Sequence, residues 1–267
     1  MNPEGDFEKI SPEQEISPEE EHFRPQIIID FIRHGQAEYG PEVRKAMEDM
    51  GYSFEDILPT SRISEDITDR ESALGGRLTD EGKRQLQEAT QSLLGTINPS
   101  KENIMILFSP RTRTAESANI ILRGLEEIGI NVSKAREQQD LTDIKGRHWL
   151  AVIEAATKAE EKPTNPFAYW YQIPDEKLRE LDLEGPRDVQ KRMDRFITLI
   201  QRYASRYRRE LNLDEKTLRV IAITHDLGLY AASRHDPESQ LKPDQIKNAQ
   251  ILELSIDSKG KESLSLK

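Results

Sequence analysis

Short apolar runs alternate along the chain with longer stretches in which apolar residues recur every three or four positions. Three of the runs, 27–32, 104–108 and 218–223, consist mainly of β-branched and other large apolar residues. Such continuous runs are typical of strands that are buried on both faces of a parallel sheet. Residues 251–256 alternate apolar with polar side chains and predict a further strand late in the chain.

Helical periodicity fills the segments between these strands. Apolar residues at helical spacing follow Thr79, whose hydroxyl can cap free backbone N–H groups, and they predict a helix over about 80–95. Similar apolar stripes predict helices over about 118–128 and 187–209. Strands that alternate with helices build a mostly parallel sheet with helices on both faces, so we predict a three-layer α/β fold.

The two ends of this pattern set the predicted domain boundaries. The first 21 residues hold eight carboxylates and three prolines but few apolar side chains, so they cannot bury enough surface to offset the entropy lost on folding. We expect residues 1–25 to form a disordered acidic tail and residues 26–267 to form one domain. Residues 38–76 are long for a connection and are predicted to be an insertion that acts as a lid or binding loop.

Composition and charge exclude several classes of protein. The sequence has no cysteine, which rules out disulfides, thiolate metal sites and a cysteine nucleophile. The net charge of -11 opposes binding to nucleic acid, because that binding needs clustered Lys and Arg. No apolar run approaches the roughly 18 residues of a membrane span, and the acidic start lacks the features of a secretory signal. We therefore predict a cytoplasmic protein that binds neither nucleic acid nor a membrane.

Polar side chains cluster where each of the three buried strands ends. The clusters are Arg33-His34-Gly35, then Ser109 to Arg113, and finally Thr224-His225-Asp226. Because parallel strands end at the same edge of a sheet, two histidines and at least two arginines should meet where α/β folds bind ligands. A single histidine or arginine at a strand end is more often structural, so the signal lies in the three clusters together.

Taken in order, these segments resemble the histidine phosphatase superfamily of phosphoglycerate mutase-like proteins, in particular its branch of small cytoplasmic phosphatases and mutases. Arg33-His34-Gly35 after an apolar strand matches that family's signature for its nucleophilic histidine. Ser109-Pro110 followed by Arg113 is similar to its second signature, and Thr224-His225 resembles the segment with the second histidine. The resemblance spans about residues 26–256 and implies the phosphoglycerate mutase-like fold.

The resemblance implies roles for four of these side chains. His34 would attack phosphorus and become a phosphohistidine, which divides one difficult displacement into two easier steps. Arg33 and Arg113 would bind the phosphate, since guanidinium groups donate parallel hydrogen bonds to it and stay charged. His225 would act in phosphate binding and in catalysis as a further donor.

The leaving group needs a proton, and two aspartates are candidates to supply it. Asp143 falls where the family's small phosphatases carry a glutamate as general acid. Asp226, beside His225, resembles the His-Asp pair with which the acid phosphatases and phytases of the other branch supply the proton. We favour Asp143, because its place in the order of segments matches the branch that the rest of the chain resembles.

We predict a phosphomonoester hydrolase that uses no metal ion and no other cofactor. The arginines and the second histidine supply the positive charge that Mg²⁺ supplies elsewhere, and carboxylates and histidines do not occur at metal-ligand spacing. The expected partner is a small phosphorylated substrate or a phosphoprotein, and the oligomeric state is left open. Two alternatives are a phosphoglycerate mutase-type phosphotransferase and a catalytically weakened phosphate-binding protein. Gly40, where the family often has an asparagine, and the short acid at Asp143 motivate the last alternative.

Overall fold

The structure is a computed structural model that describes residues 25–57, 62–63, 76–144, 150–159, 169–213, 215–235, 239, 241 and 246–267. The predicted tail of residues 1–25 therefore lies, apart from Pro25, outside the described residues. In chain order the described strands and helices are β1 (Pro25–Arg33), β2 (Glu38–Tyr39), α1 (Pro41–Asp49), α2 (Phe54–Ile57), β3 (Arg62–Ile63), α4 (Asp80–Leu94), β4 (Glu102–Phe108), α5 (Thr112–Glu127), β5 (Val132–Glu137), the short 3-10 helix η2 (Gln139–Leu141), α6 (Leu150–Thr157), α8 (Asp175–Glu180), α9 (Pro186–Arg206), β6 (Thr217–Thr224), α10 (Asp226–Ser233), β7 (Ile251–Asp257) and β8 (Glu262–Leu266).

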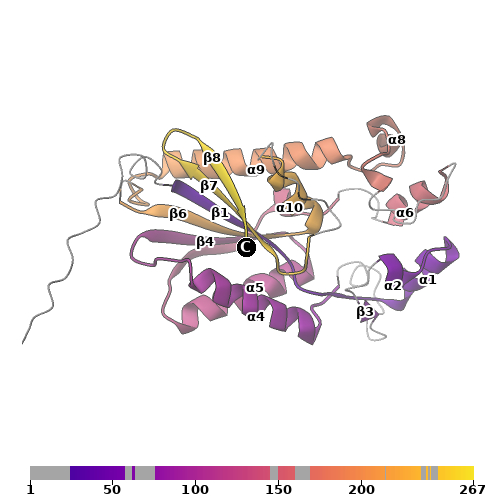
Figure 1. Ribbon diagram of the computed structural model, residues 1–267, viewed down its shortest axis with the longest axis horizontal. Helices are drawn as coiled ribbons and strands as arrows, with labels where there is room; N and C mark the ends of the chain where they lie inside the picture. The colour runs from indigo at the N-terminus through magenta and orange to yellow at the C-terminus, as the bar shows by residue number, and fades with distance from the viewer. Residues whose placement is uncertain are drawn as a thin grey trace, which may run out of the picture.

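Six described strands form the central sheet in the order β5-β4-β6-β1-β7-β8. Strands β1, β4, β5 and β6 pair in parallel, whereas β7 runs antiparallel to β1 and β8 antiparallel to β7. Figure 1 shows α4 and α5 on one side of this sheet and α9 on the other. The prediction of a three-layer α/β fold with a mostly parallel sheet is confirmed.

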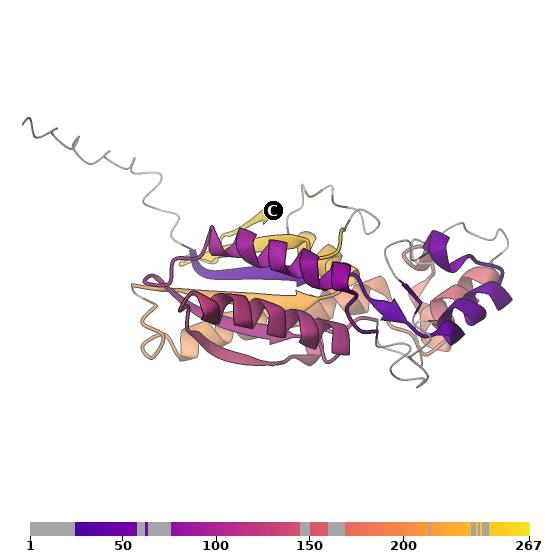
Figure 2. The same cartoon turned by 90° about the horizontal axis from the view of Figure 1, so that it is seen from below.

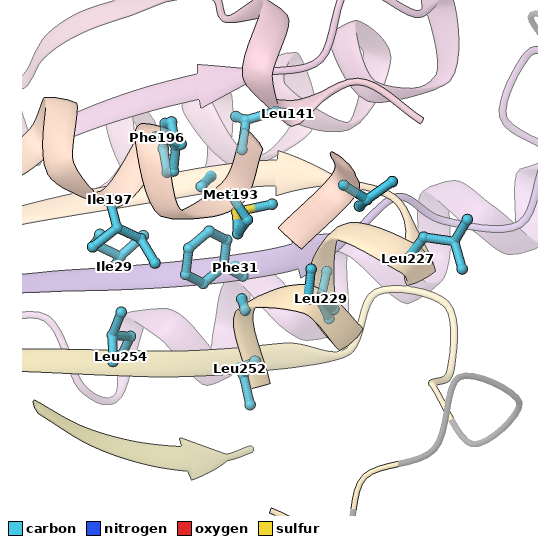
Figure 3. Packing of buried hydrophobic residues seen from close by; sticks show 14 of the residues in the cluster. Ile29, Phe31, Leu141, Met193, Phe196, Ile197, Leu227, Leu229, Leu252 and Leu254 are labelled. Carbon is cyan, nitrogen blue, oxygen red and sulfur yellow. The ribbon is translucent and has the colours of Figure 1, made fainter. Parts of the chain in front are cut away.

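Alternate side chains of the central strands enter two separate apolar cores. Ile29 and Phe31 of β1 belong to the core that includes Phe196 and Ile197 of α9, and Figure 3 shows these side chains packed together. The rings of Phe31 and Phe196 meet edge to face with their centroids 5.9 Å apart. Ile32, one position further along β1, joins the other core with residues of α4 and α5. Burial on both faces explains why the strands have nearly unbroken apolar runs.

The three helices predicted from apolar periodicity correspond to α4, α5 and α9. Helix α4 begins directly after Thr79, whose hydroxyl accepts a hydrogen bond from the backbone N–H of Gly82 over 2.9 Å, as predicted for this cap. None of the helices in the described parts of the chain, the 21-residue α9 included, is long and apolar enough to cross a membrane.

Two segments differ from the sequence-based prediction. The residues after His225, to which the sequence pattern assigns no element, begin α10. Gly228 of this helix is required by space, because a Cβ there would lie 2.4 Å from Oγ1 of Thr224. The polar segment Val132–Glu137 has no apolar run, yet it pairs with β4 as the edge strand β5. An edge strand has an unpaired side and is commonly rich in charged residues, so the apolar pattern does not reveal it.

Two connections extend beyond the carboxyl ends of the parallel strands and pack against each other. One belongs to the predicted insertion of residues 38–76 and contains α1 and α2, and the other contains α6. Tyr39 and Phe54 of the first share a small core with Ile153 of the second. Figure 2 shows these outer helices, α1, α2 and α6, apart from α4 and α5 at one end of the molecule. Other parts of the insertion lie outside the described residues.

Candidate active site

The ends of two neighbouring strands bring the predicted histidines together. His34 directly follows β1, and His225 directly follows β6, its parallel neighbour. The backbone N–H of His34 donates to the carbonyl of Thr224 over 3.1 Å, which extends the strand pairing into the site. The two imidazole rings are buried, with their centroids 5.1 Å apart and their planes at 67°.

Arg113 contacts both rings. It lies in the first turn of α5, the helix that follows β4, and it is only 4% exposed. Its Nε donates a hydrogen bond to Nε2 of His34 over 2.9 Å, and its Nη2 donates to Nδ1 of His225 over 3.2 Å. One guanidinium group thus places a positive charge between the two imidazoles.

These contacts determine which ring nitrogen of each histidine carries the proton. Nδ1 of His34 lies 2.7 Å from the carbonyl oxygen of Gly35, which can only accept, so Nδ1 donates and Nε2 directs its lone pair at Arg113. His225 has the opposite arrangement: Nδ1 accepts from Arg113, and Nε2 donates to the hydroxyl of the buried Ser109 over 3.0 Å. Both imidazoles are therefore neutral.

Burial and the nearby arginines favour this neutral state. Burial, followed by the charge of Arg113, lowers the pKa of His34 well below its ordinary value of 6.5. Burial and then the charges of Arg113 and Arg111 lower the pKa of His225 well below the same value. A neutral imidazole has a lone pair available, so His34 is suited to nucleophilic attack even in mildly acidic solution.

Arg33, the last residue of β1, is the second arginine of the site. Its Nη1 donates to the carbonyl of Ile246 over 2.5 Å, and its Nη2 lies 3.6 Å from Oδ2 of Asp226. Its Nε is buried and has no hydrogen-bond partner among the described residues. An unpaired buried donor is costly, so this N–H is suited to an anion that enters the site.

Both candidate acids border the site, in different places. Oδ2 of Asp143 lies 3.4 Å from Nη2 of Arg113 and 3.6 Å from Nδ1 of His225, and the side chain is 27% exposed. Because neutral His225 and the carboxylate both accept at these atoms, Arg113 bridges them. Asp226 contacts Arg33 instead, and its side chain is 39% exposed. The carboxylate of Asp143 thus lies against the arginine that separates the two histidines.

Arg192 of α9 holds the segment that carries Asp143. Arg192 is only 1% exposed, and its guanidinium group donates to the backbone carbonyls of Asp140, Thr142 and Asp143 over 2.8, 2.5 and 3.1 Å. Glu184 pairs with the same guanidinium group at 2.8 Å. The position of the candidate acid therefore depends on a buried ion pair outside the site itself.

Comparison with known sequences establishes the family. The sequence profile of the histidine phosphatase superfamily (branch 1) matches residues 29–267. The chain belongs to this superfamily. The resemblance seen in the strand-end clusters is thereby confirmed, although no curated protein is detectably similar to the chain.

Solved structures with the same fold include both mutases and phosphatases. A phosphoglycerate mutase from Bacillus anthracis str. Sterne is 14% identical, with 90% of this chain and 92% of that chain covered and a TM-score of 0.56. A mycobacterial glucosyl-3-phosphoglycerate phosphatase in complex with VO3 is 16% identical, with 90% and 97% covered and a TM-score of 0.50. At such low identity the likeness shows the fold, which confirms the predicted phosphoglycerate mutase-like architecture.

The histidine phosphatase signature around His34 also has a packing requirement in this chain. A Cβ at Gly35 would lie 2.4 Å from the carbonyl oxygen of Gly82 in α4, and a Cβ at Gly82 would lie 2.2 Å from the carbonyl oxygen of Gln36. The two backbones approach so closely that neither position accepts a side chain. Both glycines are therefore needed to set α4 against the segment that presents the histidine.

Sequence reasoning did not assign roles to Ser109 and Arg192, two buried polar residues of this histidine phosphatase superfamily site. Ser109 follows β4 and its hydroxyl accepts the hydrogen bond from Nε2 of His225, and its position at a strand end is the signal that could have identified it. Arg192 lies on a helix whose basic residues would ordinarily be solvated, so its burial was not visible in the sequence. Tyr39, next to the outer helices, also borders the site, with its ring centroid 5.9 Å from Cζ of Arg113.

Within the described residues, His, Asp and Glu side chains form no group of three or more that could hold a metal ion. The cations found at the site are arginines instead.

Proposed function

We propose that this chain hydrolyses phosphomonoesters through a covalent phosphohistidine on His34, without a metal ion. The observation that carries the proposal is the Arg113 guanidinium group, which is hydrogen-bonded to two buried, neutral imidazoles. This arrangement provides a nucleophile and a charge for the phosphate oxygens in one place.

Substrate binding would rearrange the contacts of Arg113. Its Nε–H is directed at the lone pair of His34 Nε2, so attack by that nitrogen requires the contact to break. Phosphate oxygens are charged acceptors and would replace Nε2 as partners of Arg113, while the unpaired Nε–H of Arg33 supplies a second donor. His225 would donate from Nδ1 only after gaining a proton there, which the charge of the phosphate favours.

The reaction then takes two displacements. In the first, the lone pair of His34 Nε2 attacks phosphorus and the bond from phosphorus to the ester oxygen breaks. Asp143, which would take up a proton from solvent when the phosphate binds, gives that proton to the ester oxygen. In the second, the Asp143 carboxylate takes a proton from a water molecule as the water oxygen attacks phosphorus. The bond between phosphorus and Nε2 breaks, inorganic phosphate leaves, and His34 is again neutral.

We assign the acid to Asp143 rather than Asp226 because its carboxylate contacts the arginine between the histidines. Arg192 supports the assignment, since it fixes the backbone of Asp143 by two carbonyl contacts on either side of the Cα atom. Asp226 pairs with Arg33 and would help to orient that guanidinium group.

Hydrolysis of an aryl phosphate in the presence of a chelator tests the proposal. His34→Ala should lower kcat by at least about 10³-fold, and rapid acid quench of the wild-type protein should trap phosphate on His34. With an alkyl phosphate, Asp143→Asn should lower kcat by about 10²-fold or more, because an alkoxide needs the proton, whereas Asp226→Asn should have the smaller effect. Undiminished activity of His34→Ala, or activity that chelator abolishes and added metal restores, would contradict the mechanism.

Product analysis separates hydrolysis from its alternatives. A phosphoglycerate mutase-type phosphotransferase would move the phosphoryl group between positions of phosphoglycerate and release little phosphate. A weakened phosphate-binding protein would bind inorganic phosphate but turn over no ester. Release of phosphate from several unrelated esters would support the hydrolase.

A further inference from the structure

A cavity of about 280 Å³ lies between the start of α9, one face of α10 and the turn at residues 170–171. Its wall is mainly apolar and includes the rings of Trp170, Tyr171 and Tyr230 together with Leu227. Figure 1 shows α10 beside α9 toward the end of the sheet from which the outer helices extend. A cavity of roughly 150 Å³ is enough to hold benzene, so this aromatic pocket has room for a ring.

The aromatic pocket and the candidate active site share helix α10. Leu227 in its wall directly follows Asp226, whose Oδ2 lies 3.6 Å from Arg33. Tyr171 belongs to the same wall, and the charges of Asp226 and Asp143 both act on its hydroxyl. Tyr171 therefore belongs to the pocket and lies within electrostatic range of both candidate acids.

The hydroxyl of Tyr171 is buried and has no hydrogen-bond partner among the described residues. Burial, and after it the negative charge of Asp226, raises the pKa of Tyr171 above its ordinary value, so the phenol keeps its proton. A buried O–H that lacks a partner among the described residues is suited to an oxygen of a ligand in this pocket.

The rest of the pocket provides apolar surface and positive charge. Tyr171 meets Trp170 and Tyr230 edge to face, with centroid distances of 4.8 and 5.1 Å, so the rings hold one another in place. Arg187 and Arg234 also line the pocket. Arg187 lies 3.6 Å from a carboxylate oxygen of a neighbouring aspartate, whereas no described carboxylate pairs with Arg234. In a chain with a net charge of -11, this guanidinium group creates a local preference for an anion.

We propose that the aromatic pocket binds the organic part of the phosphomonoester and selects a ring-bearing group with a second anionic substituent. The proposal rests on the proposed function, because it places the phosphoryl end of the same molecule at His34 and Arg113. The ring packs against Tyr230, the hydroxyl of Tyr171 donates to an oxygen near the ester bond, and the anionic substituent pairs with Arg234.

Three phosphates of primary alcohols test this assignment: ethyl phosphate, benzyl phosphate and 4-carboxybenzyl phosphate. In the wild-type protein kcat/KM should rise roughly tenfold from the first to the second and about fivefold from the second to the third. Tyr230→Leu keeps apolar volume but removes the ring, and it should cancel most of the advantage of benzyl over ethyl phosphate. Arg234→Gln should cancel the advantage of the carboxylate. Arg202→Gln, an exposed arginine elsewhere on α9, is the matched control and should change none of the three values.

The outcomes separate the pocket from the catalytic mechanism. Two results would overturn the proposed role of the pocket and leave hydrolysis at His34 intact. One is a wild-type protein that hydrolyses all three esters equally well, and the other is a Tyr230→Leu variant in which kcat/KM falls by the same factor for all three. If no ester is hydrolysed, the proposed function fails, and calorimetry then tests the pocket alone: benzylphosphonate should bind more tightly than ethylphosphonate, and equal affinities would overturn it. If Tyr230→Leu does not fold, Ala231→Leu fills the same pocket and should cause the same selective loss.

Discussion

Two buried arginines, Arg113 and Arg219, lie toward opposite ends of the parallel strands and have different kinds of partners. Arg219, near the start of β6, pairs with Asp30 at 2.7 Å, Glu102 at 2.6 Å and Glu253 at 3.5 Å, which come from three other strands. The partners of Arg113 at the other end include two neutral imidazoles and one partly exposed carboxylate. Among the described residues, three carboxylates pair with the arginine where the strands begin, and one pairs with the arginine where they end.

This difference indicates different roles for the two residues. A buried charge that loses its partner is strongly destabilising. The ion pairs of Arg219 with its three carboxylates are therefore needed for the stability of the folded sheet. Arg113 keeps capacity to bind an anion, because an imidazole acceptor is easily replaced by a phosphate oxygen. Substitutions at the two positions should therefore separate activity from stability.

Replacement of Arg113 should give the largest effect, and the effect should be on catalysis. Arg113→Gln removes the charge aimed at the phosphate oxygens and should lower kcat for an aryl phosphate by about 10³-fold, or roughly 4 kcal/mol of transition-state stabilisation. The urea midpoint should change little, since Asp143, the carboxylate paired with Arg113 in the described part of the chain, is partly exposed to water. Arg123→Gln, on the exposed side of the same helix, is the control. A large loss of stability with unchanged kcat would show that Arg113 acts in folding and not in catalysis.

Replacement of Arg219 should show the opposite pattern. Arg219→Gln leaves Asp30 and its acidic neighbours without their shared cation and should lower the free energy of unfolding by about 3 kcal/mol in urea titrations. The remaining folded protein should keep the wild-type kcat. Adding Asp30→Asn should restore part of the stability, because one uncompensated carboxylate is removed. Lack of any recovery in the double variant would show that the two residues are not coupled.

The sequence was informative about the carboxyl end of the sheet for a simple physical reason. Apolar runs locate the strands, and parallel strands end at one edge, so polar residues that follow different strands can be grouped without knowledge of the register. The segments of His34, Arg113 and His225 are grouped in this way, and the resemblance to the family then selects Arg113 from its segment. The preference for Asp143 over Asp226 needs the resemblance to a family, because the strand pattern includes Asp226 in a strand-end cluster but does not locate Asp143.

The group around Arg219 could not be predicted in the same way. Asp30 and Arg219 are 189 positions apart and appear in the sequence as single charges inside apolar runs. Their contact depends on the pairing register of β1 with β6, which places Asp30 opposite Ile221 and Arg219 opposite Ile28. Register is set by packing across the whole sheet, so the pattern of one segment does not contain it.

The pH dependence of stability should show the smallest net effect, because the two ends of the sheet respond in opposite directions. Burial lowers the pKa values of His34 and His225 well below 6.5, so below this pH the unfolded chain takes up protons that the folded protein does not. The contribution of these two histidines to the free energy of unfolding therefore falls as the pH falls. Burial raises the pKa of Asp30 from 3.8 to about 6, with Arg219 opposing it, so in this window the folded protein takes up the proton first. The contribution of Asp30 to the free energy of unfolding therefore rises as the pH falls.

Single substitutions should separate the two contributions. Asp30→Asn removes the carboxyl group whose proton uptake stabilises the folded protein as the pH falls. The thermal midpoint of this variant should therefore fall more steeply than that of the wild type between about pH 6 and pH 4. His34→Asn removes one histidine, and its midpoint should fall less steeply over the same range. The other carboxylates are common to all three proteins and cancel in the differences. Oδ1 of Asp30, which is buried and has no partner among the described residues, is the atom that would hold the proton. Each substitution removes a titrating group from one end of the sheet only. Three parallel curves of thermal midpoint against pH would therefore contradict the opposite pH dependence of the two ends.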